Sequence, residues 1–198
     1  HSFTLFPYTT LFRSKYKGVA YIPKGVEDID DNVFIGKKIN TFYFPKELKN
    51  YGKYTFYDKN VKKVIVDKEN EKFVADEKAL YSYVDGKKKL ELVFDSLDEE
   101  FVVPLDVAII GTRCFSNNKS LKRIVLSEGV QEFYHDSLRD NNSINEVFIS
   151  KSVKKFYSCI YNENEMDYYN ERINVLFYID EENPYLFRDE DSIYEVLD

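Results

Sequence analysis

The chain has 198 residues, of which 43% are hydrophobic and 32% charged, so it combines enough apolar surface for a core with a well-solvated exterior. Its formal net charge of -7 argues against a general nucleic-acid binder, which needs a positive field along the phosphate backbone. Its apolar runs are all shorter than the ~20 residues that cross a bilayer, so we predict no membrane insertion.

Residues 1–14 (HSFTLFPYTTLFRS) stand apart from the remaining sequence. They contain no acidic residue and have no counterpart later in the chain. They resemble a conceptual translation of sequencing-adapter DNA. We therefore predict that 1–14 is a non-native leader outside the fold, and that the fold occupies 15–198 as a single domain.

From Ala20 onward, one pattern of apolar residues returns in five copies. The copies begin at Ala20, Phe42, Phe101, Ile124 and Val147, so three of the four intervals are 22 or 23 residues. Within each copy, alternating apolar residues predict a strand with one buried face, and a Pro or Ser then ends it. Apolar residues three apart follow and predict a turn or short helical return segment. No single copy can bury a core, so we predict stacked coils with one continuous parallel sheet.

The interval between the second and third copies breaks this rhythm. Two apolar segments, 80–84 and 90–94, flank Asp85 and Gly86, which is a strong hairpin signal. Seven residues of this interval recur 113 positions later, from Asp67 and Asp180 onward. We expect a hairpin-bearing long repeat over about 64–100, and a second that begins at about 177 and is cut short by a C-terminal truncation.

These repeats resemble the BspA-like, or treponemal-type, leucine-rich repeats. The family's order of strand, Pro, Gly-Val, Ile, small residue and Phe is matched by 22–26, Ile29 and 33–34, whereas Ser127 and Ser150 replace Pro in later copies. The resemblance covers essentially all of 15–198. It implies a leucine-rich-repeat-like solenoid, β-rich within the α/β class, with β-hairpin insertions. It also implies a secreted or cell-surface protein; a cytoplasmic location is the alternative.

Few residues suggest chemistry. Cys114 and Cys159 lie two coils apart, which places their Cα atoms ~10 Å apart at the spacing of parallel strands. A disulfide needs roughly 4.4 to 6.8 Å, so we predict free thiols. His135 beside Asp136 is interpreted as an exposed loop histidine rather than an acid–base pair. Nucleotide-binding and zinc-hydrolase motifs are missing, so we predict no enzyme activity, no cofactor and no metal site.

The outward face of the strands is the most informative feature. Inward positions are predicted at Ile22, Phe44, Val66, Val103, Leu126 and Ile149. Their neighbours then point outward and form an apolar, aromatic stripe: Tyr21, Tyr43, Ile65, Val102, Val125, Phe148 and Tyr178. Flanking outward positions are more polar and include Lys63, Arg123 and Glu146.

An apolar stripe with a charged rim is typical of protein-recognition surfaces. We therefore predict a protein-interaction or cell-surface adhesion module, and the resemblance implies a host or neighbouring-cell surface protein as partner. Two alternatives stay open for the stripe itself: its residues pack along their own ladder, or another part of a longer protein covers them. The alternative function is a structural spacer or accessory repeat array in a larger multidomain protein, including one that carries an enzyme domain.

Overall fold

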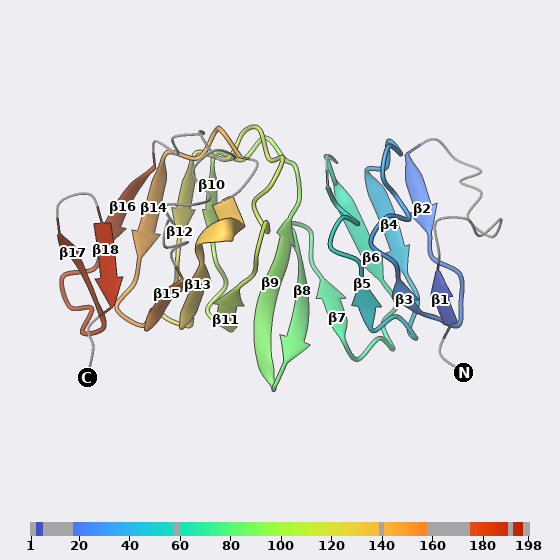
Figure 1. Ribbon diagram of the computed structural model, residues 1–198, viewed down its shortest axis with the longest axis horizontal. Coiled ribbons are helices and arrows are strands. Elements are labelled where there is room, and N and C mark those ends of the chain that lie inside the picture. The colour runs from blue at the N-terminus through green and yellow to red at the C-terminus, as the bar shows by residue number, and fades with distance from the viewer. Residues whose placement is uncertain are drawn as a thin grey trace, which may run out of the picture.

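The computed structural model describes residues 3–5, 18–57, 60–138, 141–157, 175–189 and 192–195. Within these ranges the chain consists of strands and turns, with one short 3-10 helix, η1 (His135–Leu138). The strands stack along one long axis, with the N-terminal coils at one end and the C-terminal coils at the other (Figure 1). The predicted repeat solenoid is confirmed. None of the described helices is long and apolar enough to cross a membrane.

The first strand of each coil joins one of two parallel sheets, which we call the front sheets. The first front sheet contains β2 (Val19–Tyr21), β4 (Thr41–Phe44) and β6 (Lys63–Val66). The second contains β10 (Glu100–Val102), β12 (Arg123–Val125), β14 (Glu146–Ile149) and β16 (Leu176–Ile179). Our prediction of one continuous sheet is therefore wrong, because the hairpin repeat separates β6 from β10.

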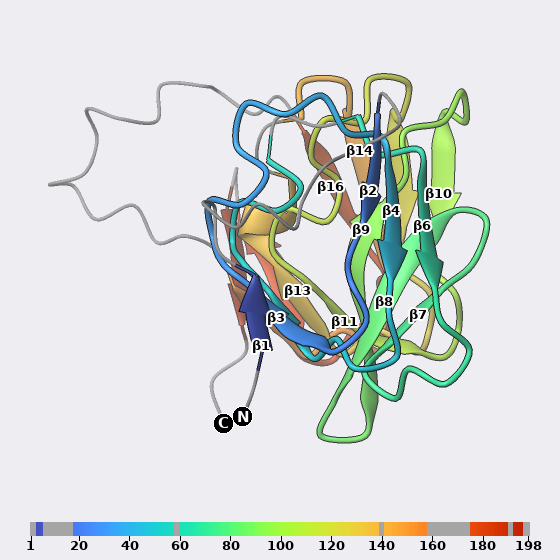
Figure 2. The same ribbon diagram turned by 90° about the vertical axis from the view of Figure 1, so that its right-hand side faces the viewer.

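The return segments form strands where we expected turns or short helical pieces. The first return sheet contains β1 (Phe3–Leu5), β3 (Val26–Ile29) and β5 (Asn50–Tyr51). In the later coils, β11 (Val107–Ile110), β13 (Glu132–Tyr134) and β15 (Lys155–Tyr157) pair in parallel. Each return segment lies beside its counterpart one repeat away, and the backbone of that counterpart offers hydrogen-bond partners. Among the described residues, η1 is the one helical segment. The core thus lies between front and return sheets (Figure 2).

β1 places Phe3–Leu5, three residues of the expected leader, beside β3 at the edge of the first return sheet. The rest of segment 1–14 lies outside the described residues. The leader and the single-domain boundaries of 15–198 remain predictions.

The predicted hairpin is present. β7 (Phe73–Ala75), β8 (Ala79–Val84) and β9 (Lys87–Val93) pair antiparallel in that order, and β9 also pairs with β11. Asp85 and Gly86 connect β8 to β9 with φ angles of 49° and 74°, the left-handed pair that a two-residue type I′ turn requires.

A second antiparallel pair repeats the first pairing of this hairpin. β17 (Leu186–Asp189) and β18 (Ser192–Glu195) pair Leu186 with Glu195, and β7 and β8 pair Phe73 with Ser82. Both residues of the later pair lie 113 positions after those of the earlier pair. The sequence duplication is thus reproduced in strand register.

The core consists of two clusters. Inward front-sheet positions are buried as predicted, except that Val66 is half-buried. Phe34 and Phe56 both pack edge-on against Phe42 in the first cluster, with ring centroids 5.4 and 5.2 Å away. Phe115 belongs to the second cluster, so a single column of phenylalanine rings does not run through the solenoid.

β8 and β9 form the wall between the two clusters. Leu80 and Leu92 pack in the first cluster, whereas Tyr81 and Leu90 pack in the second. Both faces of this antiparallel pair are therefore buried, and each half of the solenoid uses it as one side of its core.

Two buried asparagines, which sequence reasoning missed, link neighbouring coils. Asn141 donates from Nδ2 to the carbonyls of Phe115 (2.7 Å) and Asn118 (2.9 Å) in the preceding coil. Its Oδ1 accepts from the backbone amides of Ser143 and Ile144 at 2.9 and 3.1 Å. Asn118 makes the same kind of contacts one coil earlier. Recurrence of Asn at an offset of 23 residues is the sequence signal for this role.

Candidate functional site

The predicted outward residues lie on the outer face of the front sheets, in two groups rather than one stripe. The first aromatic row consists of Tyr21, Tyr43 and Ile65 on β2, β4 and β6, and the second of Val102, Val125, Phe148 and Tyr178 on β10, β12, β14 and β16. Val102, Tyr21 and Tyr178 are the most exposed, at 54%, 49% and 43%, and the other four are half-buried.

Strand register brings aromatic rings into direct contact within each row. The rings of Tyr21 and Tyr43 stack with centroids 4.3 Å apart and an interplanar angle of 14°. Those of Phe148 and Tyr178 stack at 4.7 Å and 12°. The cause is geometric: parallel strands lie about 4.8 Å apart, which is close to the stacking distance of two rings. Each stack therefore covers one face of each of its two rings.

Charged residues flank the second row. The Arg123 Nε donates to Glu146 Oε2 at 2.8 Å, and its Nη1 lies 3.4 Å from Glu100 Oε2. Its guanidinium also lies 5.6 Å from the centroid of the Phe148 ring. The hydrogen bond that Arg123 donates to Glu146, together with the charge of that carboxylate and the contact with Glu100, raises the pKa of Arg123. Beside the first row, the exposed Lys63 pairs in register with Thr41.

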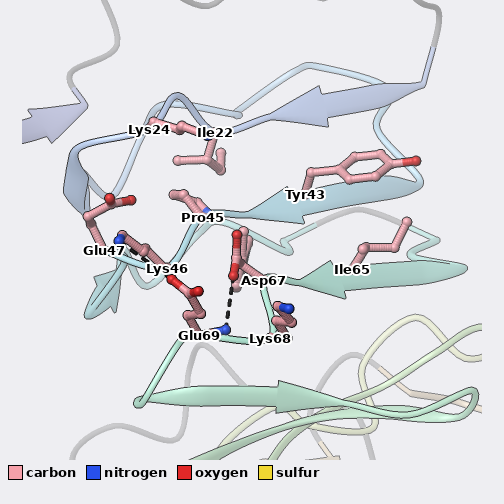
Figure 3. Close-up of a pocket in the computed structure, with 11 residues that line it drawn as sticks. Ile22, Lys24, Tyr43, Pro45, Lys46, Glu47, Ile65, Asp67, Lys68 and Glu69 are labelled. Atoms are coloured by element: carbon pink, nitrogen blue, oxygen red, sulfur yellow. Dashed lines mark hydrogen bonds and ion pairs between the residues drawn. The ribbon is translucent and has the colours of Figure 1, made fainter.

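A cavity of about 500 Å³ opens beside the first row (Figure 3). Tyr43 and Ile65 line it, and lysines and carboxylates from the turns after β4 and β6 surround the rest. Lys46 and Glu69 form an ion pair at 3.5 Å, and Asp67 accepts from the Glu69 amide at 2.9 Å. The cavity therefore extends the charged rim of the row.

The remaining predicted positions are Cys114, Cys159 and His135. Cys114 is a free, buried thiol as predicted, and burial raises its pKa well above the ordinary value. Cys159 lies outside the described residues. His135 lies in η1, but its side chain is outside the described part of the chain, so its loop assignment stays a prediction. Among the residues that the structure describes, no group of three or more His, Cys, Asp or Glu is placed to hold a metal ion.

Comparison with known sequences identifies the repeat. The family model of the BspA type leucine rich repeat region matches residues 10–82 and 94–181, in six copies. The unmatched interval between these ranges falls on the end of β8 and on β9, the inserted arm of the hairpin. No curated protein sequence matches the chain.

Two of the solved structures that match the chain illustrate the shared fold. The first, a leucine-rich repeat protein from Eubacterium ventriosum, is 23% identical with a TM-score of 0.60, over 69% of this chain and 37% of that one. The second, the pneumococcal vaccine antigen PcpA, is 19% identical with a TM-score of 0.53, over 70% of this chain and 46% of that one. The matched region thus spans less than half of either protein, and at this identity the likeness shows the fold alone.

Proposed function

We propose that this chain, which belongs to the BspA-type leucine-rich repeat family, is a non-enzymatic module that binds a protein partner through its two aromatic rows. The observation that carries the proposal is the exposure of stacked aromatic rings on an otherwise acidic protein. Tyr21 and Tyr178 keep 49% and 43% of their surface exposed although each stacks on a neighbouring ring. A flat, partly apolar face of this kind is stabilised when a partner covers it.

The aromatic rings and the arginine beside them match residue types enriched at protein interfaces. Each stack covers one face of each of its two rings, and the strand pairing fixes the rings in register. Tyrosine combines an apolar ring with a hydroxyl, which suits the mixed apolar and hydrogen-bonding contacts of a protein interface. Arg123, held between Glu100 and Glu146, adds a cation of the type enriched at the energetic centres of such interfaces.

The finer proposal is adhesion at a cell surface. It is supported by the family resemblance, and PcpA, which shares the fold, is described as a vaccine antigen. The competing proposal, a spacer array in a larger protein, is supported by the half-burial of Tyr43 and Phe148 within their own ladders. The two differ in whether the isolated chain binds anything.

The test compares proteins retained by immobilised chain from a surface-protein extract. The test variant replaces Tyr21, Tyr43 and Phe148 by Ser. A matched control replaces Ile35, Val74 and Tyr185, which are exposed but lie off the front sheets. We expect the wild type and the control to retain the same protein and the test variant to lose it. Equal retention by all three would exclude the rows as the interface, and no retention above blank resin would favour the spacer.

A further inference from the structure

The return side of the solenoid contains a cavity of about 570 Å³ where the hairpin interrupts the ordinary coils. In the coils on either side, a turn-rich loop follows the return strand, at 53–57 and 112–117. The hairpin coil replaces the corresponding loop with β8 and β9. The cavity, which we call the notch, is lined by both loops and by residues of β5, β7, β8 and β9.

The notch concentrates positive charge on a protein whose net charge is -7. Five of its lining residues are basic and one, Glu91, is acidic. The basic residues are Lys49, Lys53, Lys72, Lys89 and Arg113. A recess with one sign of charge and walls of low polarity focuses the field and attracts ions of the opposite sign.

Glu91 is already satisfied from within the protein. Its Oε2 accepts from the Tyr51 hydroxyl at 2.8 Å, its Oε1 accepts from the Ser82 hydroxyl, and Lys89 Nζ lies 3.2 Å from Oε1. This carboxylate therefore neutralises the charge of Lys89, one of the five basic residues. Because Tyr51 and Ser82 already donate to it, it does not need a hydrogen-bond donor from a ligand.

Two further lysines have other kinds of contact. Lys72 Nζ donates to the carbonyl of Tyr83 at 2.7 Å, and Lys53 lies 5.5 Å from the ring centroid of Tyr54. Neither forms an ion pair with a carboxylate that the structure describes. Their charges are thus uncompensated at short range. Lys49, by contrast, is paired with Glu27 at 2.8 Å, outside the notch.

The loop on the far wall has an unusual backbone. Arg113 and Asn117 have φ angles of 57° and 60°, in the left-handed region that side-chain-bearing residues seldom adopt. Gly36 has a φ of 71° at the equivalent end of the turn 31–36, so the conformation of Asn117 belongs to the repeat turn itself. The Arg113 guanidinium lies 5.5 Å from the ring centroid of Tyr57, which belongs to the opposite wall.

We propose that the notch binds an organic carboxylate the size of a monosaccharide, of the uronic-acid class. The ammonium groups of Lys53 and Lys72 attract the carboxylate, and Phe56 and Tyr57 offer apolar surface to a ring. Thr112, Ser116 and Asn117 place hydroxyl and amide groups on the same wall, as a ring with several hydroxyls requires. This site goes beyond the proposed function, because none of its lining residues belongs to either aromatic row.

The test is isothermal titration of the whole chain at low salt with D-glucuronate, D-glucose and inorganic phosphate. We expect glucuronate to bind at least about tenfold more tightly than glucose, and added salt to weaken it, since charge carries the difference. Phosphate should bind more weakly than glucuronate, because it lacks the ring. Equal affinity for phosphate would overturn the assignment to an organic anion, and equal affinity for glucose would overturn the role of charge.

Variants locate the site. Lys53→Gln with Lys72→Gln should weaken glucuronate binding about tenfold or more. The charge-matched control, Lys62→Gln with Lys155→Gln, changes two exposed lysines that do not line the notch and should leave binding unchanged. If the double variant fails to fold, Lys53→Gln alone replaces it as the test variant, because the Lys53 side chain is exposed. Unchanged affinity in folded notch variants, or equal losses in the control, would show that glucuronate binds elsewhere.

Discussion

Replacing Asn141 by Ala tests how the coils are held together. The Asn141 side chain is 7% exposed and makes two hydrogen bonds as donor and two as acceptor to backbone groups. At about 1 kcal/mol net for each bond, Asn141→Ala should lower the free energy of unfolding by about 4 kcal/mol. That is a large share of the 5–15 kcal/mol, roughly, that stabilises a typical domain.

The assay is equilibrium unfolding in urea, followed by circular dichroism and by tyrosine fluorescence, because the chain has 17 Tyr and no Trp. Asn142→Ala is the matched control, since the neighbouring Asn142 is exposed, and it should shift stability by less than about 0.5 kcal/mol. If the two variants unfold at the same urea concentration, the amide does not link the coils and the reasoning is refuted.

Three further predictions concern buried polar groups. Thr55 has a buried hydroxyl without a hydrogen-bond partner among the described residues, so Thr55→Val should raise the free energy of unfolding by about 1 kcal/mol, measured by urea titration. Burial, reinforced by Glu91, raises the pKa of Tyr51 well above its usual value. A raised folded-state pKa gives stability that is fully present below the unfolded pKa of about 10 and is lost as pH rises. Tyr51→Phe should therefore lower stability at neutral pH but flatten its decline above about pH 10, and an unchanged slope would contradict this. Finally, in a Cys159→Ser variant, Cys114 should react with a thiol reagent only after unfolding, because burial raises the pKa of its thiol; rapid labelling of folded protein would be inconsistent with its placement.

The features that depend on local pattern were predictable from the sequence. Alternation of apolar residues placed Tyr43 outward and Phe44 inward, and the structure agrees. Asp85 and Gly86 predicted the hairpin turn, because few other pairs adopt two left-handed conformations in succession. The repeat period predicted the stacking of coils, since a coil of this length has no other way to bury its apolar side.

The features that depend on neighbouring coils were not predictable in the same way. The spacing of Val130 and Phe133 suggested a helical return, but β13 forms because β11 and β15 offer backbone partners on both sides. The role of Asn141 was missed because its carbonyl partners belong to an earlier coil. The division of the outward residues into two rows arises from where β8 and β9 insert between the front sheets. The notch has the same origin.

The wall formed by β8 and β9 has a consequence for cooperativity. In a simple repeat array each coil contacts only its neighbours, so one end can melt while the other stays intact. Here one pair of strands completes both cores, with Leu80 on one side and Tyr81 on the other. Loss of either core exposes a face of that shared pair and weakens the other. The two halves are therefore expected to melt in a single transition, despite having separate interiors.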